Sequence, residues 1–153
     1  HSQGCSGSID QRRKGSMKLI INNISENESF ARVVVAAFCT RLDPTLEEIS
    51  DIKTAVSEAV TNCIVHGYEG REGKISLKCE LNDNELTIEV HDDGVGIDDI
   101  ERAMEPMYTS KPQLERSGMG FSFMEAFMDE LHVKSGKHSG TTVMMKKKIG
   151  VNN

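Results

Sequence analysis

The sequence predicts a two-layer α/β sandwich, in which a mixed but mostly antiparallel sheet carries its helices on one face. Segments with alternating apolar residues, typical of half-buried strands, occur mainly as pairs joined by short turns, so they can form hairpins. Two long helical patterns follow one another between the first strand and the first hairpin. The expected order is β-α-α-β-β-α-loop-α-β-β, which fits helices on one side of a sheet better than a doubly wound parallel sheet.

Residues 17–153 are predicted to form one domain, whereas residues 1–16 are polar, rich in glycine and serine, and aperiodic. We interpret the first segment as the remnant of an expression tag and exclude it from the fold. It carries three basic side chains and one acidic side chain, so the net charge of −6 for the chain becomes −8 for the domain. An acidic domain without a long apolar run is not expected to bind nucleic acid or membranes directly.

The domain has three cysteines, Cys39, Cys63 and Cys79, which lie among apolar residues and lack the spacing of a metal site. Their odd number also argues against a complete set of disulfides. We therefore expect buried thiols in a reducing cytoplasm.

The first strand is expected over residues 17–24 and the first helix directly after it. Ser25 and Glu28 have the spacing of a capping box, which predicts the start of this helix. It should end near Asp43, because Pro44 disfavours α geometry in the residue before it. The apolar residues expected to face the core are Phe30, Val33, Val34, Ala37, Phe38 and Leu42.

A second capping box, formed by Thr45 and Glu48, predicts the start of the next helix. Pro44 suits its first turn, and Gly67 is a natural stop at its C-terminus. Its apolar stripe consists of Leu46, Ile49, Ile52, Val56, Ala59, Val60 and Cys63.

The rest of the chain is predicted to alternate between hairpins and short helices. Long loops in compact domains are usually functional, which draws attention to the glycine-containing loop before the last helix. The expected elements are strands over 75–81 and 86–90 with a turn at 82–84, a helix over 97–103, a loop over 104–120, a helix over 121–129, and strands over 131–135 and 141–148.

Three polar residues of the second helix, Glu58, Asn62 and His66, are spaced i, i+4 and i+8 and so line one side of it. Such a line can simply be a solvated helix surface. Asparagine is a poor helix former, however, and the series ends at a His-Gly pair where the helix should open into a loop. Both features favour a functional role.

Two polar residues continue the inward-facing parity of apolar strands, namely Asp92 and Thr141, whereas Asp93 points away. A carboxylate that faces a core needs a partner, and no basic residue nearby in sequence is an evident one, so a ligand amine is a candidate. Gly94 and Gly96 would let the backbone approach a flat ligand. An acidic turn, and plain β propensity for the threonine, are the alternative interpretations.

Gly118 and Gly120 flank Met119 just before the last helix. Backbone amides at a glycine-rich helix start can bind phosphate, although a flexible hinge would have the same composition. Lys111 and Arg116 in the preceding loop could approach a polyphosphate or a partner protein.

Together and in this order, the motifs resemble those of the GHKL ATPase superfamily, which includes histidine-kinase and gyrase-type ATP-binding domains. The resemblance implies a Bergerat-type ATP-binding fold. It also implies that Asn62 binds Mg²⁺, that Asp92 accepts a hydrogen bond from adenine with Thr141 supporting it through water, and that Glu58 is the catalytic base. By resemblance, the residues around ATP or ADP are Asn62, His66, Asp92, Gly94, Gly96, Thr109, Ser110, Lys111, Gly118, Met119, Gly120 and Thr141.

A closer similarity, over nearly all of the domain, is to the anti-sigma F factor family of endospore-forming bacteria. It implies an ATP-dependent serine kinase that phosphorylates an anti-anti-sigma factor and, as a homodimer, inhibits sigma factor F. Arg32 and Arg116 would contact these partners, and a Thr109-Ser110 pair stands where two threonines are expected. The similarity is carried by residues 25–32, 57–62, 109–112 and 115–121.

Two other functions remain open at this point. One is a nucleotide-binding regulator of the same fold without kinase activity. The other is a detached catalytic domain of a histidine kinase. P-loop and eukaryotic-type kinase signatures are absent from the sequence.

Overall fold

The computed structural model describes residues 14–94, 120–136 and 140–150. The predicted helix over 97–103 and nearly all of the predicted loop over 104–120 lie outside these ranges. Five strands form one sheet in the order β1-β2-β3-β5-β4, and every strand pair among the described residues is antiparallel. The strands are β1 (Lys14–Asn22), β2 (Lys74–Asn82), β3 (Glu85–Asp92), β4 (Glu130–Ser135) and β5 (Thr141–Lys148).

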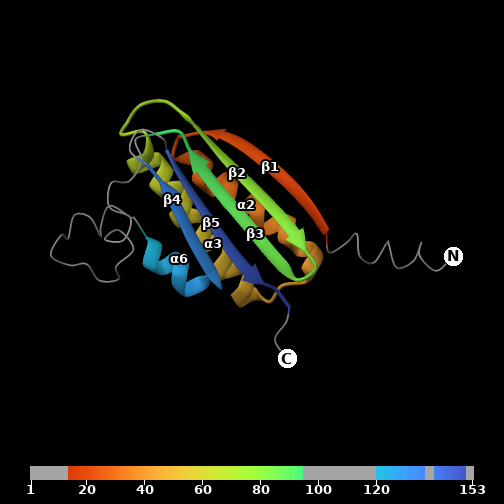
Figure 1. Ribbon diagram of the computed structural model, residues 1–153. Coiled ribbons are helices and arrows are strands. Elements are labelled where there is room, and N and C mark those ends of the chain that lie inside the picture. The colour runs from red at the N-terminus through yellow and green to blue at the C-terminus, as the bar shows by residue number, and fades with distance from the viewer. Residues whose placement is uncertain (1–13, 95–119, 137–139, 151–153) are drawn as a thin grey trace.

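The helices lie together behind the sheet in the view of Figure 1, so the predicted two-layer sandwich is confirmed. Helix α3 contacts both α2 and α6, and its C-terminal end continues without a break into a π-helical turn, η2. No helix among the described residues is long and apolar enough to cross a membrane. The helical elements are α2 (Glu26–Cys39), the 3-10 turn η1 (Thr40–Leu42), α3 (Leu46–Asn62), η2 (Cys63–Gly67) and α6 (Phe121–Phe127).

The core lies between the helices and the inward face of the sheet. Alternate residues of β2 and β3 are buried, as period-2 patterning requires. Cys39, Cys63 and Cys79 are buried free thiols, as predicted. Burial raises the pKa of both Cys39 and Cys79 to about 12, so these two thiols are protonated and inert at neutral pH.

Helix α3 begins as the sequence predicts. The hydroxyl of Thr45 accepts a hydrogen bond from the Glu48 amide at 3.0 Å, and the Glu48 carboxylate accepts one from the Thr45 amide at 2.8 Å. This is a complete capping box, which satisfies two amides that the helix itself leaves unpaired. The predicted end of the preceding helix is also confirmed, because η1 stops at Leu42 and Asp43 adopts a left-handed conformation.

The first strand begins earlier than predicted and ends earlier as well. Strand β1 starts at Lys14 and stops at Asn22, and its residues 14–16 pair with residues 80–82 of β2. The prediction that residues 1–16 lie outside the fold is therefore wrong for residues 14–16, because β2 is long enough to extend the ladder over them. That the segment comes from a tag stays a prediction.

The capping box predicted at Ser25 is wrong. Ser25 has helical backbone angles and makes no side-chain cap hydrogen bond. Glu28, its predicted partner, instead forms an ion pair with Arg32, with 3.0 Å between the carboxylate and the guanidinium. The i, i+4 spacing of these opposite charges competes with the reach back to the helix start.

The apolar stripe predicted for α2 is rotated relative to the buried one. Phe30 is 50% exposed and Val33 is 61% exposed. This helix has apolar residues on more than one side, so periodicity alone does not select the buried side. In α3 the predicted stripe is correct except at Leu46, which lies in the first turn and is 89% exposed. The residues of α2 that are buried are Ala31, Val35, Phe38 and Cys39.

Candidate functional site

Two polar side chains lie in the inward face of the sheet, where apolar residues otherwise prevail. Asp92 at the end of β3 is 2% exposed, and Thr141 at the start of β5 is 8% exposed. They are direct cross-strand neighbours in the antiparallel register. The inward orientation predicted for both from strand parity is confirmed, and Thr141 also contacts the Ser135 hydroxyl at 2.8 Å.

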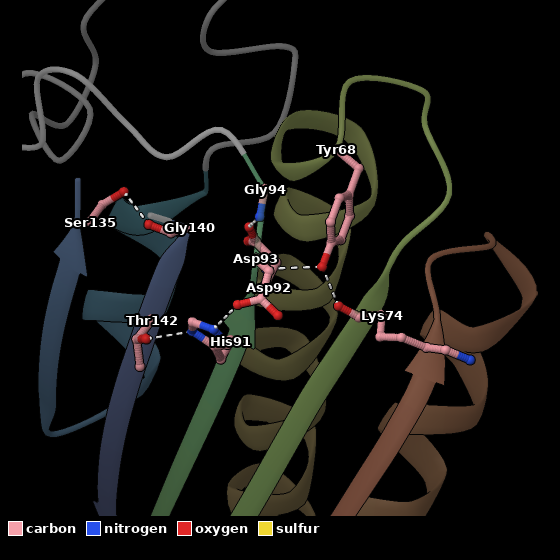
Figure 2. A network of polar contacts seen from close by, with 9 residues as sticks. All are labelled: Tyr68, Lys74, His91, Asp92, Asp93, Gly94, Ser135, Gly140 and Thr142. Carbon is pink, nitrogen blue, oxygen red and sulfur yellow. Dashed lines mark hydrogen bonds and ion pairs between the residues drawn. The ribbon is translucent and has the colours of Figure 1, made fainter. Parts of the chain in front are cut away.

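Asp92 has two uncharged hydrogen-bond donors. The Gly94 amide donates to its Oδ1 at 2.8 Å, as Figure 2 shows, and the Cys63 thiol also donates to the carboxylate. Burial raises the pKa of Asp92, and these two donors only partly oppose that effect. No ion pair with Asp92 occurs among the described residues, although the charge of His91 also lowers its pKa. Sequence reasoning missed the Cys63 partner because it is 29 positions away.

Three glycines let the backbone close in on Asp92. A Cβ at Gly67 would lie 2.8 Å from the Asp92 carboxyl carbon, and a Cβ at Gly140 would collide with the Asp92 carbonyl oxygen. A Cβ at Gly94 would collide with the carbonyl oxygen of Gly67. Only Gly94 is among the predicted site residues. The His-Gly pair that ends the helical motif was a signal for Gly67, although we interpreted it only as a helix stop.

The helical side of the site carries Asn62 and Glu58. Asn62 is 9% exposed, and Glu58 one turn earlier is half-buried. Burial raises the pKa of Glu58, and the negative charge of Glu28 on α2 raises it further. The predicted straight line of polar residues ends at Asn62. His66 is partly buried and lies in η2, where the wider π turn displaces it from the i, i+8 position of a regular α-helix.

The glycine at the start of α6 meets the helical side of the site. Gly120 has a φ of 60°, and a Cβ there would collide with the Glu58 carboxylate. The only described residue of the predicted phosphate-binding segment therefore lies against Glu58. The other predicted site residues in this part of the chain lie outside the described ranges, namely Gly96, Thr109, Ser110, Lys111, Arg116, Gly118 and Met119.

A second polar network holds the end of β3 (Figure 2). The Tyr68 hydroxyl accepts a hydrogen bond from the Asp93 amide at 2.9 Å and donates one to the Lys74 carbonyl oxygen. His91 contacts the Asp93 carboxylate at 2.8 Å and the Thr142 hydroxyl at 2.7 Å. These contacts tie β3 to β2, to β5 and to the segment after η2, so they fix the strand end from which Asp92 projects.

Comparison with known proteins assigns the chain to a family. The histidine kinase-like ATPase domain family matches residues 24–147. The anti-sigma F factor of Clostridium novyi is 60% identical over 134 residues, which cover 87% of this chain and 94% of that protein. That of Clostridium acetobutylicum is 62% identical over 127 residues, covering 83% and 89%. The chain belongs to the anti-sigma F factor family.

Two solved structures share the fold of this anti-sigma F factor family member at low sequence identity. The RsbU and RsbW domains of Rv1364c from Mycobacterium tuberculosis superpose with a TM-score of 0.64 at 18% identity, covering 88% of this chain and 32% of that one. The catalytic domain of the histidine kinase ThkA gives a TM-score of 0.54 at 16% identity, covering 88% and 96%.

The geometry fits the nucleotide that an ATPase domain of this family implies. Asp92 is a buried acceptor, and the backbone at the surrounding glycines packs directly against it or against its neighbours. The described residues contain no group of three acidic, histidine or cysteine side chains that could hold a metal alone. A single amide oxygen from Asn62 suits Mg²⁺, which usually takes few protein ligands and completes its shell with water and phosphate oxygens.

Proposed function

We propose that this chain is an anti-sigma factor for sigma factor F and an ATP-dependent kinase that phosphorylates a serine of an anti-anti-sigma factor. The observation that carries the proposal is the buried Asp92 carboxylate, which faces the helical layer within a backbone shaped by glycines. Asn62 and Glu58 are the polar residues that α3 supplies to the proposed site. Membership of the anti-sigma F factor family supports the assignment of partners.

The nucleotide would lie with its base at Asp92 and its phosphates toward α3. Asp92 would accept a hydrogen bond from the adenine amino group, and Thr141, its cross-strand neighbour, would support that contact through water. Gly94 would let the backbone after β3 pass close to Gly67 beside the base. Asn62 would hold Mg²⁺, which supplies charge neutralisation at the phosphates when it is bound.

Glu58 is proposed as the catalytic base. The serine oxygen would attack the γ-phosphorus, the bond to the bridging oxygen of ADP would break, and Glu58 would accept the hydroxyl proton. Its raised pKa brings it closer to the neutral range in which a base is most effective. Its contact with the backbone at Gly120 would restrict the side chain and hold its oxygens in place.

The surface beside Glu58 could receive a partner protein. Arg32, the proposed partner residue of α2, lines a groove together with residues of α3 that run from Leu46 to Ser57, which precedes Glu58. An acceptor chain lying in this groove would end near the base. We also propose that Arg116 contacts a partner protein and that the chain assembles into a homodimer. The other residues proposed to contact the nucleotide are His66, Thr109, Ser110, Lys111, Gly118 and Met119.

The test is phosphoryl transfer from γ-labelled Mg-ATP to the anti-anti-sigma partner, comparing the parent with Glu58→Gln. The variant should bind nucleotide as the parent does but transfer label at least about 100-fold more slowly, because a general base contributes on the order of 100-fold or more. Glu47→Gln, which removes an exposed carboxylate from the first turn of the same helix, is the control and should transfer normally.

Each alternative has its own outcome in the same assay. Label on a histidine would identify a histidine-kinase activity and reject the serine kinase. Nucleotide binding without any transfer by the parent would indicate a regulator that uses ATP only to set its conformation. Equal transfer by the parent and Glu58→Gln would reject Glu58 as the base.

A further inference from the structure

Tyr68 bridges two backbone groups at the point where the sheet ends. The pairing of β2 with β3 stops at Ile75 and Asp92, so Lys74 and Asp93 are next in register. The Tyr68 hydroxyl lies between them, accepting from the Asp93 amide at 2.9 Å and donating to the Lys74 carbonyl oxygen (Figure 2). We propose that Tyr68 is a positioning residue, which holds the chain after β3 so that Asp92 faces the nucleotide base. The inference rests on the proposed nucleotide site.

The inserted hydroxyl opens the end of the β2–β3 ladder. Hydrogen-bonded and non-hydrogen-bonded pairs alternate along antiparallel strands, and the two-residue turn makes Asn82 and Glu85 a hydrogen-bonded pair. Counting along the register from that pair, Lys74 and Asp93 would also be hydrogen-bonded. A direct bond would hold the amide and the carbonyl oxygen about 2.9 Å apart, and two successive bonds through an oxygen hold them farther apart. The chain after Asp92 is thus released from β2.

The released chain turns toward the helical layer, where Gly67 at the end of η2 receives it. A Cβ at Gly94 would collide with the Gly67 carbonyl oxygen, so the two backbones are in contact. From this position the Gly94 amide donates to Asp92 Oδ1 at 2.8 Å. Rotation about the aspartate χ2 angle is soft, so this amide is needed to orient the carboxylate. Tyr68 fixes the intervening Asp93 amide, and the orientation of the carboxylate therefore depends on the hydroxyl.

The Tyr68 ring is itself held in place. Tyr68 is buried, and a Cβ at Gly73 would collide with its ring. Gly73 is fixed in turn by Asn23, whose side-chain oxygen accepts from the Gly73 amide at 3.0 Å and whose backbone amide donates to the Gly73 carbonyl oxygen at 3.1 Å. The ring thus packs on a backbone that cannot shift freely, and the hydroxyl has both of its bonds made.

Filling the end of the core is the competing explanation, because Tyr68 also belongs to the buried apolar cluster. If that were its only role, loss of the hydroxyl would weaken the binding of every nucleotide equally, through the stability of the fold. A positioning role instead changes the contact with one group of the ligand, the 6-amino group that Asp92 would bind. The ratio of two affinities therefore separates the two explanations.

The experiment measures dissociation constants for ATP and for purine riboside triphosphate, which lacks the 6-amino group, by titration calorimetry. The parent should prefer ATP by at least about tenfold, as expected for one hydrogen bond to a charged group. Tyr68→Phe, which keeps the ring, should reduce this preference by about threefold or more, because a misaligned hydrogen bond is weaker. Gly73→Ala, which displaces the ring, should do the same. Thr87→Val, which removes a hydroxyl from the other face of β3, is the control and should leave the preference unchanged.

Amide hydrogen exchange in the nucleotide-free protein tests the route of the effect. The Gly94 amide should exchange at least about tenfold faster in Tyr68→Phe than in the parent, because its bond to Asp92 requires the chain after β3 to be held. The Thr87 amide, in the middle of β3, should exchange at the same rate in both proteins.

A preference that is unchanged in whichever of Tyr68→Phe and Gly73→Ala folds would overturn the positioning role while leaving the proposed nucleotide site intact. An unchanged exchange rate at Gly94 would show that the hydroxyl does not act through this turn, and would overturn it too. A parent that binds both triphosphates equally would reject base recognition by Asp92, and the inference with it. The label-transfer assay would then still decide whether the chain is a kinase.

Discussion

At the scale of single residues, the site depends on a carboxylate kept in an unfavourable environment. Asp92 has a raised pKa because burial outweighs its two donors. The pKa of Asp92 in the folded protein therefore lies above the unfolded value, which is about 3.9 for aspartate. The contribution of this side chain to stability is present below the unfolded pKa and is lost as the pH rises through the folded pKa. At neutral pH the ionised side chain therefore opposes folding, which is a common feature of functional sites.

We expect Asp92→Asn to increase the free energy of unfolding of the nucleotide-free protein at pH 7 and to remove ATP binding. The gain should shrink as pH falls toward about 4, because Asp92 in the parent then becomes protonated and loses its penalty. Urea denaturation between pH 4 and pH 7 measures the first effect, and calorimetry measures the second. Asp83→Asn, on the exposed turn before β3, is the control. A less stable Asp92→Asn at pH 7 would mean that the two donors outweigh burial.

At the scale of elements, two similar sequence signals at the helix starts have different outcomes. The capping box of α3 forms completely, whereas the one predicted for α2 does not form. The difference lies in the glutamates: Glu48 reaches back to the Thr45 amide, and Glu28 pairs forward with Arg32. Sequence spacing therefore predicts where a cap can form, and competing partners decide whether it does.

Replacing the two predicted caps provides a direct comparison. Thr45→Ala should lower the free energy of unfolding by about 1 kcal/mol, because it removes the acceptor of the Glu48 amide. Ser25→Ala should change it by less than about 0.5 kcal/mol, since Ser25 makes no cap hydrogen bond. Chemical denaturation of both variants measures the difference, and equal losses would contradict the assignment.

At the scale of the whole molecule, the site lies where one end of the sheet meets one end of the helical layer (Figure 1). The end of β3 supplies Asp92, and η2 supplies Cys63 and Gly67. The two layers approach so closely here that Gly94 packs its backbone against the Gly67 carbonyl oxygen. A side chain at this junction would push sheet and helix apart, so glycine is required for steric reasons.

Gly94→Ala should therefore lower the free energy of unfolding by at least about 2 kcal/mol. The new Cβ would collide with the carbonyl oxygen and carbon of Gly67, which are backbone atoms that cannot move aside cheaply. Gly15→Ala is a matched control in β1. A Cβ there would lie 2.6 Å from the end of the flexible, exposed Arg41 side chain, which can rotate away, so the change should stay within about 0.5 kcal/mol. Urea denaturation of the nucleotide-free variants checks both values. Similar stabilities would show that the layers can separate without penalty.

The sequence by itself determined the kind of each described strand and α-helix, the closing hairpin, the α3 capping box and the inward orientation of Asp92 and Thr141. These features depend on periodicity or on contacts between residues close in the chain, so they are encoded locally. Only the tertiary structure decided which side of α2 is buried, which donors meet Asp92, and that Gly120 lies against Glu58. Those outcomes depend on residues far apart in sequence, whose meeting requires the sheet and the helical layer to pack together first.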